Sequence, residues 1–238
     1  MTKELQATGK QIRFQFLSVL SHELKAPLNA IEGYLRMMQE RQLGNQLDDY
    51  EQAIERSMQR IKGMRTLILD LLDMTRIESG QKEKNIQELN LASIASNAID
   101  TAKPIAIQKD VKISLRASSD VTFFADSSEM EIVFNNLISN AVKYNKDGGA
   151  VEVLIDKQND AVIIKVSDSG IGMAQEDLAR LFQDFVRIKN EKTREISGTG
   201  LGLSIMKKVV ETYNGKVEVS STPDVGSVFT VTLPIKAQ

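Results

Sequence analysis

The chain has one histidine, His22, and its surroundings suit nucleophilic chemistry. Leu17 and Leu24 occupy equivalent heptad positions of a predicted helix, which places His22 on the side farthest from the apolar seam. A solvent-exposed imidazole can offer an unprotonated ring nitrogen as a nucleophile. Glu23 can reach the other ring nitrogen and accept its proton, and Pro27 removes a helical hydrogen bond, so that the helix can bend beside His22. Taken alone, the pattern fits an inert surface histidine better than a nucleophile.

Polar side chains line one face of another predicted helix, which begins near Asp126. Asn136, Asn140 and Lys143 are spaced at i, i+4 and i+7, so they share a face. Asparagine is a mediocre helix former, so this placement costs stability. Amide oxygens are ligands that Mg²⁺ accepts when phosphates supply the others, Lys143 offers a charge for phosphate, and Tyr144 offers a ring for a base. The alternative is a partly exposed polar face without a ligand.

A carboxylate and two glycines follow a strand-like apolar run at 162–167. Asp168, fixed at the end of a strand, can accept a hydrogen bond from an adenine amino group. Gly170 and Gly172 allow the backbone to approach a ligand closely. The same pattern also fits a plain turn, so by itself it is weak evidence.

A glycine-rich turn leads directly into the last predicted helix, over 204–213. A helix N-terminus presents free N–H groups and the positive end of its dipole to phosphate. The turn has neither the strand-first context of a dinucleotide-binding fingerprint nor the Gly-Lys-Ser/Thr of a P-loop. The residues predicted to bind phosphate here are Gly198, Thr199, Gly200, Leu201, Gly202 and Leu203.

The segment between these turns, 173–198, contains Lys189, Lys192 and Arg194. We interpret part of it as a mobile lid over a nucleotide, with an ordinary loop as the alternative.

Apolar residues that recur every seven positions predict two helices before residue 80. The pattern breaks at 42–46, so the helices should form an antiparallel hairpin, with a domain over 1–80. One hairpin cannot bury both flanks of its stripe, which favours a homodimeric four-helix bundle; the alternative is packing against the second half of the chain. The stripe consists of Leu17, Leu24, Leu28, Ile31, Leu35 and Met38 in the first helix, and of Ile54, Ile61, Met64, Ile68 and Leu71 in the second.

The pattern changes after a polar linker at 78–82, and a second domain is expected over 85–238. Asp126 and Glu129 predict a capping box at the start of one helix. Hairpin turns at 157–160 and 222–226, combined with helices, predict an α+β sandwich with a mixed sheet and helices on one face. The expected helices cover 91–108, 127–145 and 201–214, and the expected strands cover 111–116, 151–156, 161–167, 216–221 and 227–233.

The composition limits the classes of function. The net charge of −2 gives no reason to expect nucleic acid or an anionic membrane as a partner. The chain lacks cysteine, which excludes disulfides and, with a single histidine, makes a zinc site improbable. No apolar run is long enough to span a membrane, so we expect no membrane insertion by this chain and a cytoplasmic location, with upstream domains still possible.

Together, these motifs resemble the catalytic core of sensor histidine kinases of two-component signalling, in the GHKL superfamily. Five boxes occur in the family's order. They are the H box at 16–28, the N box at 136–144, the G1 box at 168–172, the F box at 181–187 and the G2 box at 198–203.

The resemblance implies a hairpin for dimerisation and phosphotransfer, followed by a Bergerat-type ATP-binding domain. It implies that His22 accepts the γ-phosphoryl group of ATP, that Glu23 acts as base, and that an aspartate of a response-regulator receiver domain is the next acceptor. Asn140 would hold Mg²⁺ with support from Asn136, and Asp168 would contact adenine. The remaining nucleotide-binding residues would be Lys143, Tyr144, Gly170, Gly172, Arg187 and the glycine-rich turn at 198–203.

Three positions depart from the family's pattern. Ala26 stands where the phosphatase motif has Thr or Asn, four residues after the histidine, which predicts weak or absent phosphatase activity. Asp184 and Val186 replace a common proline and tyrosine of the F box, which puts contacts of the lid in doubt.

Two other readings stay open. Clamp-type ATPases of the topoisomerase, chaperone and mismatch-repair groups share the Bergerat pocket, but they place a glutamate one turn before the metal-binding asparagine, where this chain has Asn136. A scaffold that binds ATP without chemistry is the second alternative.

Overall fold

The computed structural model describes the backbone of residues 2–44, 46–79, 84–118, 121–188, 190–194, 196 and 198–235, and their side chains from residue 19 onward apart from 47 and 79. The predicted linker positions 80–82, the predicted lid residue Lys189 and the side chain of Leu17 lie outside this description. The residues form two compact units, Met1–Leu69 and Asp70–Gln238.

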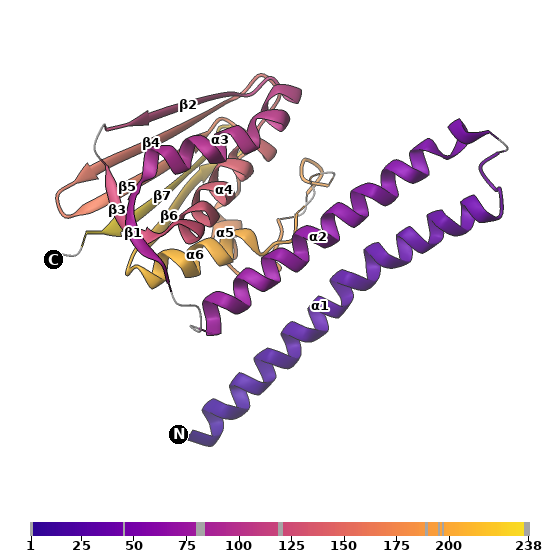
Figure 1. The fold of residues 1–238 in the computed structure, drawn as a ribbon, viewed down its shortest axis with the longest axis horizontal. Helices are drawn as coiled ribbons and strands as arrows, with labels where there is room; N and C mark the ends of the chain where they lie inside the picture. The colour runs from indigo at the N-terminus through magenta and orange to yellow at the C-terminus, as the bar shows by residue number, and fades with distance from the viewer. Residues whose placement is uncertain are drawn as a thin grey trace. The chain divides into compact units, whose positions relative to one another are not determined.

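The two predicted antiparallel helices come first in the chain, and the first unit includes them up to Leu69 of the second helix (Figure 1). Helix α1 spans Thr2–Gln39, a short 3-10 helix η1 spans Leu47–Tyr50, and helix α2 begins at Glu51 and ends at Ser79. The break between α1 and η1 falls at the predicted turn. Large apolar side chains of the predicted stripe stay exposed in the single chain; they include Leu28, Leu35, Ile54, Ile61 and Ile68.

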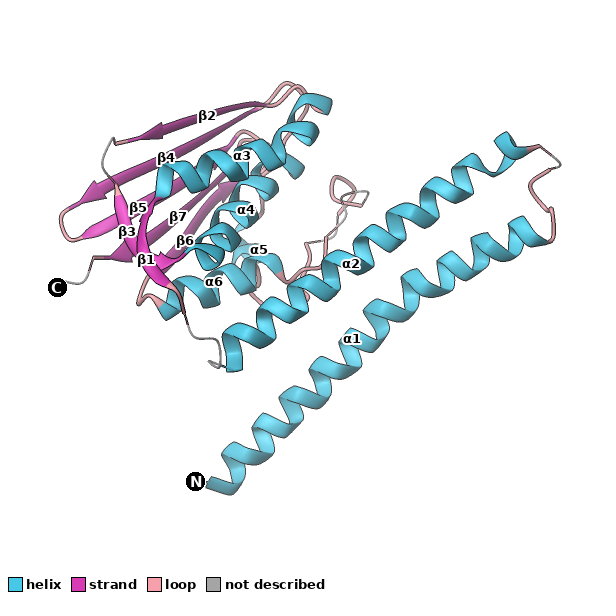
Figure 2. Cartoon of the chain, in the orientation of Figure 1, coloured by secondary structure: helices cyan, strands magenta, loops and turns pink. Residues whose placement is uncertain are grey.

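The second unit is a mixed five-stranded sheet with helices on one face, as predicted (Figure 2). Its strand order is β2-β4-β5-β7-β6, and β2 is parallel to β4 while the other pairs are antiparallel. The strands are β2 Lys112–Ala117, β4 Ala150–Gln158, β5 Ala161–Asp168, β6 Lys216–Thr222 and β7 Gly226–Pro234. The helices are α3 Leu91–Gln108, α4 Ser127–Lys143, α5 Gln175–Leu178 and α6 Gly202–Thr212.

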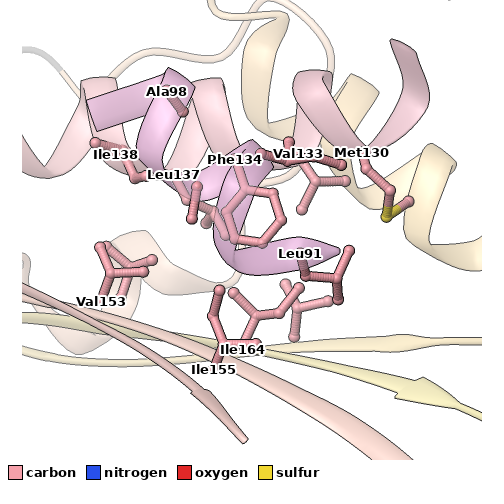
Figure 3. Packing of buried hydrophobic residues seen from close by; sticks show 14 of the residues in the cluster. Leu91, Ala98, Met130, Val133, Phe134, Leu137, Ile138, Val153, Ile155 and Ile164 are labelled. Atoms are coloured by element: carbon pink, nitrogen blue, oxygen red, sulfur yellow. The ribbon is translucent and has the colours of Figure 1, made fainter. Parts of the chain in front are cut away.

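The hydrophobic core lies between the sheet and the layer of α3, α4 and α6, with α4 packed against both other helices. Figure 3 shows Phe134 and Leu137 of α4 pointing toward Ile155 and Ile164 of the sheet. All four side chains are at most 1% exposed. The opposite face of α4, which carries the predicted polar site, is thereby held at a fixed distance from the sheet.

Two short strands were not predicted from the sequence. Strand β1, Ile86–Asn90, and strand β3, Thr122–Asp126, pair as a separate antiparallel ribbon. Each has five residues, and only Leu89 of β1 is buried, so β1 shows no alternating pattern. The ribbon places Asp126 at the start of α4.

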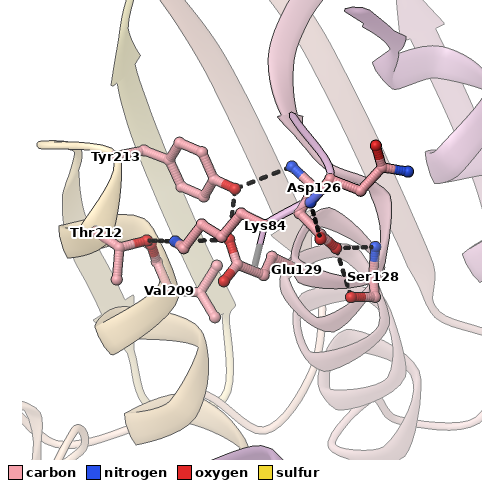
Figure 4. Close-up of polar contacts among 8 residues, drawn as sticks. Lys84, Asp126, Ser128, Glu129, Val209, Thr212 and Tyr213 are labelled. Carbon is pink, nitrogen blue, oxygen red and sulfur yellow. Dashed lines mark hydrogen bonds and ion pairs between the residues drawn. The ribbon is translucent and has the colours of Figure 1, made fainter. Parts of the chain in front are cut away.

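The start of α4 is held by a polar network that differs from the predicted capping box (Figure 4). Asp126 is the N-cap, and its carboxylate accepts from the backbone N–H of Ser128 at 3.0 Å. Glu129 does not complete a capping box, because its carboxylate accepts from the Tyr213 hydroxyl and pairs with Lys84 Nζ at 3.0 Å. The Tyr213 hydroxyl also accepts from the backbone N–H of Asp126. The network therefore joins α4, the end of α6 and Lys84, two residues before β1.

Replacing Tyr213 with Phe should destabilise the second unit. The change removes a donor to the buried Glu129 and an acceptor for Asp126, which costs about 1–3 kcal/mol when buried partners lose a hydrogen bond. Burial, reinforced by the bond to Glu129, raises the pKa of Tyr213 above its ordinary value, so the phenol stays a donor at neutral pH. Thermal and urea unfolding should show the loss, with Tyr34→Phe in the first unit as control. Equal stability of Tyr213→Phe and the unchanged protein would contradict the network's role.

No helix in the described part of the chain is long and apolar enough to cross a membrane.

Candidate functional site

The predicted polar face of α4 is present, and the side chain of its middle residue, Asn140, is accessible to a ligand. Asn136, Asn140 and Lys143 are each partly exposed, between buried neighbours of the same helix. Asn136 Nδ2 donates to the carbonyl of Ile132 at 2.8 Å. The Asn140 amide has no hydrogen-bond partner among the described residues, so its oxygen is available to a ligand.

The glycine-rich turn before α6 lies directly against this face. A Cβ built on Gly202 would be 2.0 Å from Asn136 Oδ1, so a larger residue there would displace the Asn136 side chain. Gly200 has a φ of 76°, and a Cβ on it would be 2.8 Å from the backbone of Phe185. The structure thus brings the N box, the F box and the G2 box together at the start of α6.

The G1 turn meets the other end of α4. A Cβ on Gly170 would be 2.3 Å from the carbonyl oxygen of Tyr144. That same oxygen accepts from the backbone N–H of Ile171 at 3.1 Å. Gly172 is packed instead against the β6–β7 turn, where a Cβ would be 1.9 Å from the carbonyl oxygen of Thr222. The carboxyl end of α4 therefore lies beside the residues predicted to contact the base.

The Asp168 carboxylate is oriented by two backbone donors. Oδ1 accepts from the N–H of Gly170 at 2.8 Å and from the N–H of Ser227 at 3.3 Å. No other bond to this carboxylate forms among the described residues, which leaves Oδ2 as an acceptor for a ligand. Burial raises the pKa of the Asp168 carboxyl, and the two backbone bonds oppose this shift only in part.

Three of the predicted phosphate-binding residues have other contacts. Leu201 is completely buried, so its side chain supports the turn rather than binding a ligand, and Leu203 packs against the core. Thr199 Oγ1 donates to the carboxylate of Asp70, which belongs to the same compact unit, and accepts from the N–H of Leu201 at 3.2 Å. Gly198 is exposed.

Arg187 is placed in the segment between the two glycine turns. Its guanidinium donates to the carbonyl of Ile196. It also borders a cleft of about 310 Å³, and the other lining residues are Asp177, Arg180, Val186, Ile188 and Asn190. In this segment the buried Thr193 hydroxyl donates to the carbonyl of Ile188 at 2.7 Å. The predicted lid function is not tested by these contacts.

The predicted phosphoacceptor pair lies on α1 of the first unit. His22 and Glu23 are both exposed, in agreement with the heptad position derived from the sequence. Pro27 is inside the same helix, one turn further on. The imidazole is therefore accessible to a reaction partner.

The residues present fit ATP and a magnesium ion. Gly170 and Gly200 pack closely on other backbone segments, and Gly202 begins α6, whose first N–H groups have no carbonyl partner within the helix and can bind phosphate. Among the described residues no three carboxylates or imidazoles gather, so a magnesium ion here would take Asn140 together with phosphate oxygens and water.

Three contributing residues were missed in the sequence. Asp70 bonds to Thr199 across 129 positions, and Asn145 and Ser169 bond to each other across 24. No short-range pattern marks such pairs. The sequence did offer a signal for Asn145, because it directly follows Tyr144 at the end of the predicted polar helix.

Two family models match the chain in sequence order. The first is described as "His Kinase A (phospho-acceptor) domain" and matches residues 12–80. The second is described as "Histidine kinase-, DNA gyrase B-, and HSP90-like ATPase" and matches residues 125–237.

Curated proteins also match nearly the whole of this chain in sequence. The chain is 33% identical to a non-motile and phage-resistance protein of Caulobacter vibrioides, over 99% of this chain and 29% of the relative. It is 32% identical to the sensor histidine kinase GacS of Pseudomonas protegens, over 94% of this chain and 25% of the relative. It therefore spans less than a third of these curated relatives.

Solved structures share this fold, and one of them illustrates the match. It is histidine kinase ThkA in complex with response regulator protein TrrA, with a TM-score of 0.74 and 19% identity, covering 93% of this chain and 61% of that chain.

Proposed function

Because the chain belongs to the sensor histidine kinases of the GHKL superfamily, we propose that it phosphorylates its own His22 with ATP and passes the phosphoryl group to an aspartate of a receiver domain. The observation that carries the proposal is the Asn140 amide on α4, unpartnered among the described residues, with Gly202 against Asn136 of the same face and Gly170 against the Tyr144 carbonyl at the end of the helix. Residues 85–238 would bind the nucleotide, and residues 1–80 would carry the acceptor histidine.

Each residue of the site then has a task. Asn140 would hold a magnesium ion, which would supply charge neutralisation for the phosphates. Lys143 adds a positive charge for phosphate, Tyr144 and Arg187 border the nucleotide, and Asp168 Oδ2 accepts from the adenine amino group. Asn136 supports Asn140 at the metal: its Nδ2 donates to the carbonyl of Ile132, and its Oδ1 lies beside Gly202.

The transfer itself needs a nucleophile and a proton acceptor. A ring nitrogen of His22 attacks the γ-phosphorus, the bond from that phosphorus to the β–γ bridging oxygen breaks, and ADP leaves. The carboxylate of Glu23 takes the proton from the other ring nitrogen, so that the phosphorylated imidazole ends neutral rather than as a positively charged imidazolium. Positioning and charge neutralisation supply most of the rate enhancement.

The exposed apolar stripe supports a homodimer. Leu35, Ile54, Ile61 and Ile68 are each 44–54% exposed in the single chain. Two hairpins that face each other would bury these side chains as a four-helix bundle. We place this part of the protein in the cytoplasm, where ATP and receiver domains are available. We expect no nucleic-acid partner.

A clamp-type ATPase is the second candidate. It needs a carboxylate one turn before Asn140 to activate water. That position holds Asn136, whose amide donates to its own helix, so transfer to a side chain is favoured over hydrolysis.

The test is a two-step transfer. The protein is labelled with γ-labelled ATP and Mg²⁺, freed from nucleotide, and mixed with purified receiver domains. We expect the label to leave the kinase and appear on the aspartate of at least one receiver. Label that stays on the kinase with every receiver, or label released only as free phosphate at the outset, would contradict the proposal.

We expect weak phosphatase activity toward a phosphorylated receiver. Ala26 is exposed one turn after His22 but has no polar group to orient a water molecule. Ala26→Thr should raise the rate of receiver dephosphorylation by about tenfold or more, in the range typical of a positioned group. Dephosphorylation is measured by loss of label from the receiver. Ala26→Val is the control, because valine has nearly the shape of threonine but no hydroxyl. No gain in Ala26→Thr over Ala26→Val would rule this interpretation out.

A further inference from the structure

A buried amide lies behind the residues proposed to bind the base. Asn145 is 4% exposed and directly follows Tyr144 at the end of α4. Its Nδ2 donates to the carbonyls of Ala141 at 3.1 Å and Ala150 at 3.0 Å. Its Oδ1 accepts from the N–H of Lys146 at 3.1 Å and from Ser169 Oγ at 3.2 Å. A carboxamide has two donor hydrogens and two acceptor lone pairs, so the side chain is fully used.

These bonds join three separate elements. Ala141 belongs to α4, Ala150 begins β4, and Ser169 directly follows Asp168. Ser169 is tied to β4 twice, because its Oγ accepts from Ala150 N–H at 2.8 Å and its own N–H donates to the Ala150 carbonyl at 3.1 Å. The amide therefore fixes the residue next to Asp168 to the helix that carries Asn140.

The surroundings leave no room for adjustment. A Cβ on Gly149 would be 2.1 Å from Asn145 Oδ1, and a Cβ on Gly170 would be 3.0 Å from the Cα of Asn145. Two glycines thus enclose the residue from both sides. A side chain of a different length or hydrogen-bonding pattern could not preserve the four bonds.

A second contact holds the same helix end without touching the Asp168 turn. Lys109 Nζ donates to the carbonyl oxygens of Lys143 at 2.8 Å and Asn145 at 2.6 Å. These carbonyls lie at the end of α4, where the helix itself provides no donors. Lys109 therefore contributes to the stability of the helix end, and it serves as a control that separates stability from positioning.

We propose that Asn145 is a positioning residue for base recognition, which sets the Asp168 carboxylate relative to α4 so that the site reads the 6-amino group of adenine. This inference rests on the proposed contact between Asp168 and adenine. A single acceptor distinguishes an amino group from a carbonyl only if it is held within about 0.5 Å of its place. Asn145, through Ser169, provides that constraint.

The test compares ATP with inosine triphosphate, which has a carbonyl in place of the 6-amino group. Dissociation constants for both nucleotides are measured by calorimetry on the full chain, for the unchanged protein, Asn145→Ser, Ser169→Ala and Lys109→Met. The ratio of the two constants measures base discrimination, and a uniform loss of stability does not change it.

We expect the ratio in Asn145→Ser and Ser169→Ala to fall about fivefold to tenfold, as for the loss of one or two hydrogen bonds. In Lys109→Met the ratio should stay unchanged even if both affinities weaken. If Asn145→Ser does not fold, Ser169→Ala decides, since it removes only one hydroxyl.

Equal weakening of both nucleotides in Ser169→Ala, with an unchanged ratio, would overturn the inference and leave Asn145 a stabilising residue. The proposed function fails in a different way. If the unchanged protein binds ATP no better than inosine triphosphate, Asp168 does not read adenine and this inference falls alone. If it binds neither nucleotide, the proposed function falls with it.

Discussion

His22→Gln is expected to lose all covalent label from γ-labelled ATP while it keeps its affinity for ATP. Glutamine has a similar reach but no ring nitrogen that could attack phosphorus, so the acceptor is removed without loss of helix propensity. His22 is exposed and belongs to the first unit, whereas Gly170, Gly200 and Gly202 belong to the second. Substitution should therefore leave the nucleotide site unchanged. Autoradiography of the protein and calorimetric titration with ATP measure the two quantities.

Glu23→Gln provides a graded comparison at the neighbouring position. It keeps His22 but removes the proton acceptor, and such a group typically contributes about 10²–10⁴-fold to a rate. Slow but complete labelling is expected. Label at the unchanged rate would exclude Glu23 as base, and label retained in His22→Gln would exclude His22 as acceptor.

Asp168→Asn should weaken ATP binding by about tenfold to 100-fold, because a hydrogen bond to a charged group is lost. Both backbone donors bond to Oδ1, so an asparagine oxygen can keep them and its Nδ2 replaces Oδ2. That amide would face the adenine amino group donor to donor. Inosine triphosphate offers an acceptor instead, so the variant should lose or reverse the preference for ATP, as measured by competition titration. An unchanged preference would show that Asp168 does not contact the base.

The same substitution has an expected effect on stability. Burial raises the pKa of the Asp168 carboxyl above its ordinary value of 3.8, so the ionised form is less favourable in the folded than in the unfolded chain. Its contribution to stability is present below that ordinary value and is lost as the pH rises through the raised pKa. At neutral pH, Asp168→Asn should therefore unfold at a higher temperature than the unchanged protein in the absence of nucleotide.

ATP binding should have the opposite dependence on pH. The affinity of the unchanged protein falls as the pH drops through the raised pKa, since a protonated carboxyl is a poorer acceptor. Asp168→Asn lacks this step. A step of equal size in both proteins would assign the titration to another group.

Much of the fold follows from hydrophobic periodicity. Strands β4 to β7 match the expected ranges closely because their alternation is set by burial on one face of a sheet, and α3 matches its range at both ends. The exposure of His22 follows from the same argument applied to a heptad. Such patterns can be predicted because they depend only on residues that are close together in the sequence.

Other features depend on partners that are distant in sequence. Glu129 was assigned to a capping box because Asp126 precedes it by three residues, but Tyr213 and Lys84 determine its role in the folded chain. The side chain of Leu201 in the predicted phosphate-binding turn is completely buried, so only its backbone could face a ligand. The two cases share a cause, since a sequence shows spacing and not which distant side chain fills the remaining hydrogen bonds or volume.

The most direct measurement is the chemical nature of the phosphoryl linkage on the protein. The chain is incubated with γ-labelled ATP and Mg²⁺, and the labelled protein is exposed to acid and to alkali before the modified peptide is mapped. A phosphorylated histidine predicts label that is lost in acid, kept in alkali and located on the peptide that contains His22. Acid-stable label, or steady release of free phosphate without labelled protein, would contradict the account.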